Sequence, residues 1–256
     1  MKVVILAGGK GTRLRDATED LVPKPMVTVG GIPMLEHIIR IYAAQGFDDF
    51  VIAGGHLIET IVEWNRSRTP ILVDRLGISS VQVIDTGVDT QTGGRIKSLV
   101  DQGVLVHEPF MMTYGDGMAD INLKALIQFH HEKAESGATV TLTAVNPPSR
   151  FGMLRIENGY AKLFGEKTQS EDGWINGGFY VIEPEAVEMI NGDACRWEFD
   201  VLPVLAIQGR LSAYQHPGFF QMCDTWRDLQ VLTKLYEESA PWLRMENGDV
   251  FKSFTV

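Results

Sequence analysis

Cysteine is scarce in this sequence, whose 256 residues include only Cys195 and Cys223. The two lie far apart, outside any Cys-x-x-Cys pattern and without the spacing of metal ligands. This scarcity excludes a small disulfide-held scaffold and gives no sign of a zinc site. We expect both residues to be free, buried thiols, which is typical of a protein from a reducing compartment.

Long apolar runs and an excess of positive charge are also missing. No stretch approaches the roughly 20 apolar residues that span a bilayer, and the first apolar run stops at Ala7 without a signal-peptide cleavage pattern behind it. These features predict a cytoplasmic protein with no membrane partner. The formal net charge of −10 argues against a nucleic-acid partner, so an anionic ligand would need a local basic pocket.

The composition, with 45% hydrophobic and 22% charged residues, is that of an ordinary globular chain, and we expect one domain over 1–256. The first half alternates between two kinds of segment. Strand-like segments cover 2–8, 48–55, 79–86 and 109–117, and helix-like segments cover 33–46, 57–65 and 122–137. This alternation predicts a mainly parallel sheet with helices on both faces.

The second half contains several short strand-like segments in succession. They cover 139–145, 152–158, 160–166 and 177–184. Short turns between them, such as Glu157-Asn158-Gly159, predict antiparallel pairing, so we expect the sheet to be mixed.

Two helices of this half have boundary residues in the sequence. The helix over 122–136 begins with Asn122 as its expected N-cap and ends before Gly137. The last helix covers about 225–238 and carries leucines at helical spacing on one face.

The stretch VVILAGGKGTRL (3–14) turns from an apolar strand into a loop with three glycines and the cations Lys10 and Arg13. Glycines let backbone N–H groups come close to a phosphate chain, and nearby cations add charge. The P-loop pattern is excluded because no Gly-Lys follows at the required distance. The dinucleotide-binding fingerprint is excluded because Leu14 stands where it needs its third glycine. The alternatives are a triphosphate site of another kind or a tight turn with solvated cations.

Two segments together, GGKGTRL (8–14) and VPKPMVTVGGIPML (22–35), resemble the signature of the sugar-phosphate nucleotidyltransferases. Later motifs resemble the glucose-1-phosphate cytidylyltransferase branch of that family over nearly the whole chain. These motifs are DTG and TGGRIK within 85–97, TYGDGMAD (113–120), PPSRFG (147–152), Glu166-Lys167, INGGFYVI (175–182) and PGFFQMCDTWRD (217–228). The sequence departs from the pattern at Thr168, where the family has proline, and over about 65–82, where its connection is shorter.

This resemblance implies a Rossmann-like, doubly wound α/β fold with a mixed sheet and an antiparallel extension. It also implies a reaction in which CTP and a sugar 1-phosphate, first of all α-D-glucose 1-phosphate, give a CDP-sugar and pyrophosphate with Mg²⁺ as cofactor. Another hexose or heptose 1-phosphate, or another nucleoside triphosphate, stays open. Enzymes of this kind assemble into trimers or hexamers, so a homo-oligomer is expected.

The resemblance assigns roles to individual residues as well. Catalysis falls to Arg13, Lys24, Asp116 and Asp224, and the two aspartates would hold Mg²⁺, which prefers carboxylate oxygens. Nucleotide binding falls to Leu6, Ala7, Gly8, Gly9, Gly11, Thr12, Arg13, Lys24, Thr92, Gly93, Gly94, Arg95 and Asp116. Binding of the sugar phosphate falls to Tyr114, Gly152, Glu166, Lys167, Asn176 and Gly177.

Several of these residues have a simpler structural explanation. Asp224 alone is a candidate N-cap for the last helix, and Arg95 is a candidate surface arginine at a helix start. Glu166-Lys167 would be an exposed hairpin pair worth little energy. By contrast, the glycines 177 and 178 have no packing reason in the sequence, which favours a ligand lying against the backbone.

Two other functions are compatible with a fold of this type. A nucleotide-sugar glycosyltransferase needs an Asp-x-Asp element, which Asp116-Gly117-Met118 does not supply. A non-catalytic nucleotide-binding regulator would have no use for two metal carboxylates together with Arg13 and Lys24. Asp120 is expected to be structural, and the six histidines have no spacing that suggests a metal site or a triad.

Overall fold

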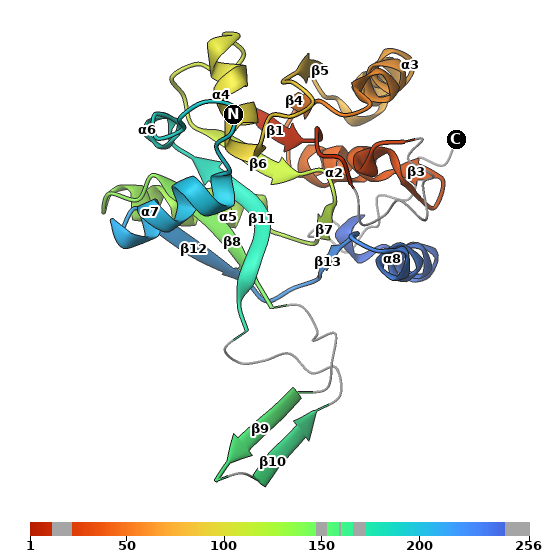
Figure 1. The fold of residues 1–256 in the computed structure, drawn as a ribbon. Helices are drawn as coiled ribbons and strands as arrows, with labels where there is room; N and C mark the ends of the chain where they lie inside the picture. The colour runs from red at the N-terminus through yellow and green to blue at the C-terminus, as the bar shows by residue number, and fades with distance from the viewer. Residues whose placement is uncertain (12–21, 147–152, 159, 166–172, 244–256) are drawn as a thin grey trace.

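The structure is a computed structural model that describes residues 1–11, 22–146, 153–158, 160–165 and 173–243. Seven strands form its central sheet in the order β12-β8-β11-β6-β1-β4-β5 (Figure 1). Their bounds are Val3–Leu6 (β1), Asp49–Gly54 (β4), Ser80–Asp85 (β5), Phe110–Tyr114 (β6), Val140–Val145 (β8), Ile175–Ile182 (β11) and Leu211–His216 (β12).

The pairing in this sheet is mainly parallel. β1 pairs in parallel with β4 and β6, β4 with β5, and β12 with β8. β11 is antiparallel to both of its neighbours, β6 and β8. The predicted mixed sheet is therefore confirmed, although one strand alone among these seven reverses direction.

In the described part of the chain, three two-stranded sheets accompany the central one. β9 (Met153–Glu157) and β10 (Tyr160–Gly165) form the predicted antiparallel hairpin, which lies apart from the central sheet in Figure 1. β7 (Gly117–Ala119) pairs with β13 (Phe220–Met222), and β2 (Thr28–Val29) pairs with β3 (Ile32–Pro33). The pairing of β7 with β13 brings two segments about 100 positions apart in the chain to the same place.

Helices cover both faces of the central sheet. Their bounds are Met34–Ala43 (α2), Ile58–Leu76 (α3), Thr92–Asp101 (α4), Leu123–Ala134 (α5), Pro184–Val187 (α6), Leu202–Ile207 (α7) and Trp226–Glu238 (α8), with short turns at Lys24–Met26 (η2), Trp197–Val201 (η3, a π-helical turn) and Pro241–Leu243 (η4). Alternate residues of β1 point to opposite faces, so Val3 and Ile5 share one core with α2, α3, α5 and α8. Val4 and Leu6 share the other core with α4, α6 and α7. This is the doubly wound arrangement that was expected.

One helix is longer than its sequence pattern predicted. The expected segment ends at residue 65, but α3 continues to Leu76 and passes through Pro70. Tertiary contacts hold this extension, because Arg68 Nε lies 2.8 Å from Glu36 Oε2 on α2 and Leu72 is buried in the core. None of the helices in the described part of the chain combines the length and hydrophobicity needed to cross a bilayer.

The order of the strands determines where a ligand is expected. From β1 the chain adds β4 and β5 on one side of the sheet and then returns to add β6 on the other side. In doubly wound sheets such a reversal leaves a crevice at the carboxyl ends of the strands, and ligands bind there. The glycine loop after β1 and the turn after β6 meet at this crevice.

Candidate active site

A cleft of about 510 Å³ lies at the carboxyl ends of β1 and β6. The glycine loop forms one wall, and the segment from Val88 to Thr92 before helix α4 forms another. Nine of the predicted nucleotide-binding residues line it: Leu6, Ala7, Gly8, Gly9, Gly11, Lys24, Thr92, Arg95 and Asp116. Thr12 and Arg13 lie outside the described residues, so their roles stay predictions.

Arg95 packs against the glycine loop and hydrogen-bonds to its backbone. Its side chain is buried, and Nη2 donates a hydrogen bond to the Gly8 carbonyl at 2.8 Å. Nη1 donates to the carbonyls of Gly54 at 2.9 Å and Gly87 at 2.8 Å. Arg95 is therefore not the surface arginine of the alternative interpretation, and its contact with a phosphate stays a prediction. A Cβ at Gly8 would lie 2.1 Å from Arg95 Nη1, so part of the reason for this glycine is internal packing.

Gly93 and Gly94 lie in the first turn of α4 and face away from the cleft. A Cβ at Gly93 would lie 2.9 Å from the Cys195 carbonyl oxygen, and one at Gly94 would lie 2.5 Å from that of Asp193. Gly94 N also donates to the Cys195 carbonyl at 3.1 Å. These glycines let α4 pack closely on the segment 193–195, and this packing places Arg95 under the loop. Their proposed contact with a base stays a prediction.

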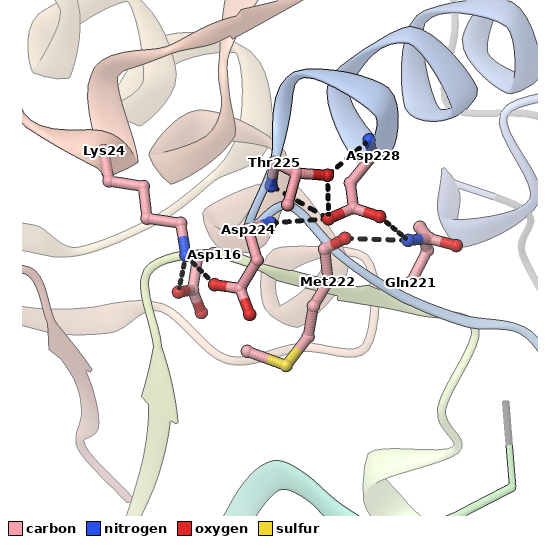
Figure 2. Close-up of polar contacts among 7 residues, drawn as sticks. All are labelled: Lys24, Asp116, Gln221, Met222, Asp224, Thr225 and Asp228. Carbon is pink, nitrogen blue, oxygen red and sulfur yellow. Dashed lines mark hydrogen bonds and ion pairs between the residues drawn. The ribbon is translucent and has the colours of Figure 1, made fainter. Parts of the chain in front are cut away.

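Lys24 joins the two predicted metal ligands, as Figure 2 shows. Its Nζ lies 2.6 Å from Asp116 Oδ2 and 2.5 Å from Asp224 Oδ1. Two further contacts bring the three segments together. Cys223 N donates to the Asp116 carbonyl at 2.9 Å, and a Cβ at Gly115 would lie 2.7 Å from Pro25, so the turn after β6 sits directly on η2.

The electrostatics of this cluster favour a charged lysine. Burial by itself would lower the pKa of Lys24, but the carboxylates of Asp116 and Asp224 outweigh that effect and leave its pKa raised. The three side chains are only 12%, 18% and 11% exposed, so water screens the interaction weakly. Among the side chains that the structure describes, one cation, Lys24, faces the two carboxylates of Asp116 and Asp224.

The donor set at this cluster fits Mg²⁺. Asp116 Oδ1 is buried and has no hydrogen-bond partner in the described structure, although a carboxylate oxygen normally accepts at least one bond. Among the described residues no group of three or more His, Cys, Asp or Glu side chains could hold a metal by itself. Mg²⁺ is commonly bound by one or two carboxylates plus substrate phosphates, so two aspartates at a phosphate cleft suit it.

Asp224 is not the N-cap of the last helix. Thr225 caps α8, because its Oγ1 accepts from Asp228 N at 3.3 Å while Asp228 Oδ2 accepts from Thr225 N at 2.9 Å, a reciprocal capping box. Asp228 Oδ2 also accepts from Asp224 N at 3.1 Å (Figure 2). The helix start thus fixes the backbone of Asp224 and leaves its carboxylate directed at Lys24.

A second cavity of about 260 Å³ adjoins the cleft on the far side of Asp116. Three predicted sugar-phosphate residues, Tyr114, Asn176 and Gly177, line it together with Asp116 and Asp224. We call the 510 Å³ cleft the nucleotide half and this cavity the sugar half of the site, after the roles assigned by resemblance. The predicted residues Gly152, Glu166 and Lys167 lie outside the described residues.

The glycine pair in β11 does have a packing reason, contrary to the expectation from sequence. Gly178 has φ +76°, and a Cβ there would lie 2.4 Å from the ring of Tyr114. A Cβ at Gly177 would lie 2.6 Å from Val145 Cγ1. The pairing of β11 with β8 also shifts register between Asn176 and Tyr180, as at a β-bulge. The contact of Gly177 with a sugar phosphate stays a prediction.

Comparison with known proteins shows the family to which the chain belongs. A family model for nucleotidyl transferases matches residues 2–242. The chain belongs to the nucleotidyl transferase family. The resemblance to sugar-phosphate nucleotidyltransferases that was recognised in the motifs is therefore confirmed, and the protein is an enzyme of this class.

Individual relatives of this nucleotidyl transferase agree with that assignment. A glucose-1-phosphate cytidylyltransferase of Salmonella typhi is 42% identical over 96% of this chain and 100% of its own length. A probable glucose-1-phosphate cytidylyltransferase of Bacillus subtilis is 40% identical over 93% of this chain and 97% of its own. The crystal structure of HddC from Yersinia pseudotuberculosis has a TM-score of 0.69 and 25% identity, covering 92% of this chain and 99% of the other.

Three further polar residues of this nucleotidyl transferase, Cys223, Asp120 and Asn122, have structural explanations. Burial raises the pKa of the Cys223 thiol to about 12, so it stays a neutral, inert thiol, and both cysteines are buried and free as expected. Asp120 Oδ1 accepts from Phe219 N at 2.6 Å and lies 3.0 Å from His216 Nε2, which fixes the turn before β13. The cap of α5 is Asn122, as predicted.

Sequence reasoning missed several residues of the site. Val88, Asp89, Thr90 and Gln91 line the nucleotide half, and the flanking motifs DTG and TGGRIK were a signal that pointed to this segment. Glu198 and Met222 line the sugar half. Met222 lies within the motif PGFFQMCDTWRD, whereas no quoted motif includes Glu198.

Proposed function

We propose that this protein transfers the cytidylyl group of CTP to a sugar 1-phosphate, first of all α-D-glucose 1-phosphate, and releases pyrophosphate. The observation that carries the proposal is the contact of one lysine, Lys24, with Asp116 and Asp224 between a glycine-lined cleft and a second cavity. Relatives that are named glucose-1-phosphate cytidylyltransferases support the choice of donor and acceptor.

The reaction needs alignment and charge neutralisation more than proton transfer. An oxygen of the sugar phosphate attacks the α-phosphorus of CTP, and the bond from that phosphorus to the β-phosphate oxygen breaks, so the electron pair leaves with pyrophosphate. The second pKa of a phosphate monoester is about 6, so the attacking group is already ionised at neutral pH. The site must therefore hold two polyanions in line against their mutual repulsion.

The chain supplies cations and backbone donors for this task. Gly8, Gly9 and Gly11 allow the triphosphate to approach the backbone N–H groups of the loop. Lys24 contacts both aspartates, and its ammonium would donate to phosphate oxygens in the complex. Arg13, which lies outside the described residues, is proposed to contact the departing β and γ phosphates, where a guanidinium suits two-point contact.

Asp116 and Asp224 are proposed to hold Mg²⁺, since Oδ1 of Asp116 is buried and has no hydrogen-bond partner among the described residues, which suits a metal ligand. The ion supplies positive charge to the phosphate oxygens when bound. Tyr114, Asn176 and Gly177 are proposed to surround the sugar phosphate, together with Gly152, Glu166 and Lys167 from outside the described residues. By resemblance, we also propose a homo-oligomer, either a trimer or a hexamer, that works in the cytoplasm.

The test is pyrophosphate release with each nucleoside triphosphate across a panel of sugar 1-phosphates in the presence of Mg²⁺. We expect CTP with α-D-glucose 1-phosphate to give the highest kcat/KM and equal amounts of pyrophosphate and CDP-glucose. A preference for another pair would correct the substrate but keep the reaction. Transfer of the sugar from CDP-glucose to an acceptor would identify a glycosyltransferase, and nucleotide binding without turnover would identify a regulator.

A further inference from the structure

A chain of hydrogen bonds runs through the sugar half and ends on a carboxylate that has no assigned role. Asn176 Nδ2 donates to Tyr180 Oη at 2.5 Å, and Tyr180 Oη lies 2.9 Å from Tyr114 Oη. Tyr114 Oη donates to Glu198 Oε1. The other carboxylate oxygen, Oε2, accepts from Thr92 Oγ1 at 2.7 Å.

The direction of this chain is fixed at both ends. Gly178 N donates to Asn176 Oδ1 at 2.9 Å, which makes that atom the amide oxygen and leaves Nδ2 to face Tyr180. At the other end, an ionised carboxylate can only accept, so the Tyr114 hydroxyl must donate to Glu198. Tyr180 then has to donate to Tyr114, and it accepts from Asn176. An amide in place of Glu198 could turn its N–H group toward Tyr114, and the Tyr114 hydroxyl would then lose its acceptor.

The environment of the chain keeps its members in place. Tyr180 is fully buried, and its ring packs edge-on against those of Tyr114 and Trp197. Burial, followed by the neighbouring Tyr180 and Glu198, raises the pKa of Tyr114, so its hydroxyl keeps its proton at any physiological pH. Gly178 leaves room for the Tyr114 ring, as its own Cβ would collide with it.

Glu198 also connects the two halves of the site. It lies on the π-helical turn η3 and lines the sugar half, while its partner Thr92 opens α4 and lines the nucleotide half. Thr92 Oγ1 accepts from Trp197 N at 2.9 Å, and the hydroxyl proton of Thr92 is donated to Glu198. π-helical turns are rare and occur frequently at functional sites. Here the turn places a carboxylate between Tyr114 and Thr92.

We propose that Glu198 is a positioning residue that accepts the last hydrogen bond of the chain and so orients Tyr114, and through Tyr180 also Asn176, toward the sugar phosphate. This inference rests on the proposed function, because it assumes that the sugar half receives the acceptor. It assigns Glu198 no contact with the reacting atoms. Its effect reaches the substrate through Tyr114 and Asn176.

The test compares Glu198→Gln, Tyr114→Phe and the double variant with the wild type. Glutamine keeps the size of the side chain but can present an N–H donor to Tyr114, so the chain no longer ends on an obligatory acceptor. Loss of a charge-assisted hydrogen bond of this kind predicts a rise of about tenfold in the KM for the sugar 1-phosphate in each single variant. Both changes interrupt the same chain of hydrogen bonds. The KM of the double variant should therefore also rise by no more than about tenfold.

Two further measurements separate positioning from a structural role. The Kd of CTP should stay within about twofold of the wild-type value, since the glycine loop and Lys24 are untouched and the amide oxygen of glutamine can still accept from Thr92. Glu185→Gln, an exposed acid at the start of α6, is the matched control and should keep the wild-type KM. An unchanged KM in a folded Glu198→Gln protein would overturn the proposal, as would multiplicative losses in the double variant or equal losses of CTP affinity.

The experiment also separates this proposal from the proposed function. Pyrophosphate release by the wild type and by Glu185→Gln establishes the reaction independently of Glu198. If no nucleotide gave turnover, the proposed function would fail on its own. The shift in Tm that α-D-glucose 1-phosphate produces, which needs no turnover, would then test Glu198 directly. A shift of equal size in wild type and Glu198→Gln would refute the positioning role.

Discussion

Lys24 and Asp224 are 200 positions apart in the chain, yet Nζ of the lysine lies 2.5 Å from Oδ1 of the aspartate. The same ammonium is 2.6 Å from Asp116 Oδ2, so it keeps two largely buried carboxylates from facing each other without a counter-charge. Removing one partner from a buried charged cluster usually costs more than the cluster contributes, because a buried charge is left without compensation. The contact therefore makes Lys24 important both for stability and for the chemistry.

Replacement of Lys24 by methionine should affect activity and stability in different ways. Turnover should fall by about two to three orders of magnitude, because the variant loses a hydrogen-bond donor that stabilises the charge of the transition state. The Tm should also fall, because Asp116 and Asp224 then repel each other. Mg²⁺ added without substrate should raise the Tm of Lys24→Met more than that of the wild type, which differential scanning fluorimetry measures.

A matched control for this variant is Lys234→Met, which breaks an exposed ion pair with Glu238 at 3.7 Å. Such surface pairs contribute little, so its Tm and its response to Mg²⁺ should equal those of the wild type. Equal Mg²⁺ responses in Lys24→Met and wild type would count against a metal site formed by the two aspartates.

Two neighbouring glycines of the loop should respond differently to alanine. A Cβ at Gly8 would lie 2.1 Å from the Arg95 guanidinium, whereas a Cβ at Gly9 would meet no atom of the described residues within 4 Å. Gly8→Ala should therefore lose about 1–3 kcal/mol of unfolding free energy through overpacking. Gly9→Ala should keep its stability but bind CTP more weakly, because its methyl group occupies the surface offered to the phosphates.

Urea denaturation and calorimetric titration with CTP check this pair of variants. The comparison is sharp because both changes add the same methyl group, one residue apart. If Gly9→Ala bound CTP with wild-type affinity, the loop would not be the phosphate-binding element. If Gly8→Ala were as stable as the wild type, Arg95 could not pack closely against Gly8.

The sequence predicted the layers of this fold better than the details of its sheet. Periodicity identified the strands β1, β4, β5 and β6 and the helices α2, α5 and α8, because each buries an apolar face that local spacing reveals. It did not identify β12, whose position beside β8 depends on a pairing between segments about 70 residues apart. The length of α3 was also missed, since Pro70 argues for a stop that Arg68 and Leu72 overcome through tertiary contacts.

The sequence predicted those residues of the site that lie within recognisable motifs. Lys24, Asp116 and Asp224 were named from motif resemblance, and the structure brings them within hydrogen-bond distance. Glu198 was not predicted, because its contacts arise only in the folded chain, where the η3 turn places it between Thr92 of α4 and Tyr114 of β6. Similarly, the glycines 177 and 178 suggested a ligand, while their neighbours Tyr114 and Val145 became visible only in three dimensions.

The capping box of α8 gives a prediction that concerns stability first. Thr225→Ala removes the side chain that accepts from Asp228 N, and loss of an N-cap costs about 1 kcal/mol. Turnover should change only a few-fold, because Asp228 still accepts from Asp224 N and holds the metal-ligand candidate in place. Asp228→Ala removes that bond as well and should lower both stability and turnover. Denaturation curves and pyrophosphate release distinguish the two variants, and equal turnover in both would refute the link between the cap and Asp224.

A buried histidine predicts how stability depends on pH. His37 is fully buried; its Nε2 donates to the Val29 carbonyl at 2.9 Å, and its Nδ1 accepts from Trp242 Nε1 at 3.3 Å. Both ring nitrogens are therefore satisfied in the neutral form, and protonation would point two donors at each other. Burial lowers the pKa of His37 from 6.5 to about 4.

The sign of the effect follows from the two states. The unfolded chain binds a proton at His37 below pH 6.5, whereas the folded chain resists it until about pH 4. The contribution of neutral His37 is thus present above pH 6.5 and is lost as the pH falls toward 4, by about 3 kcal/mol in total. His37→Gln cannot titrate, so its unfolding free energy should fall less steeply over this range, whatever its stability at neutral pH. Urea denaturation at a series of pH values measures the slopes, with His131→Gln, an exposed histidine on α5, as the control. Parallel slopes for His37→Gln and wild type would show that His37 is not held neutral in the folded protein.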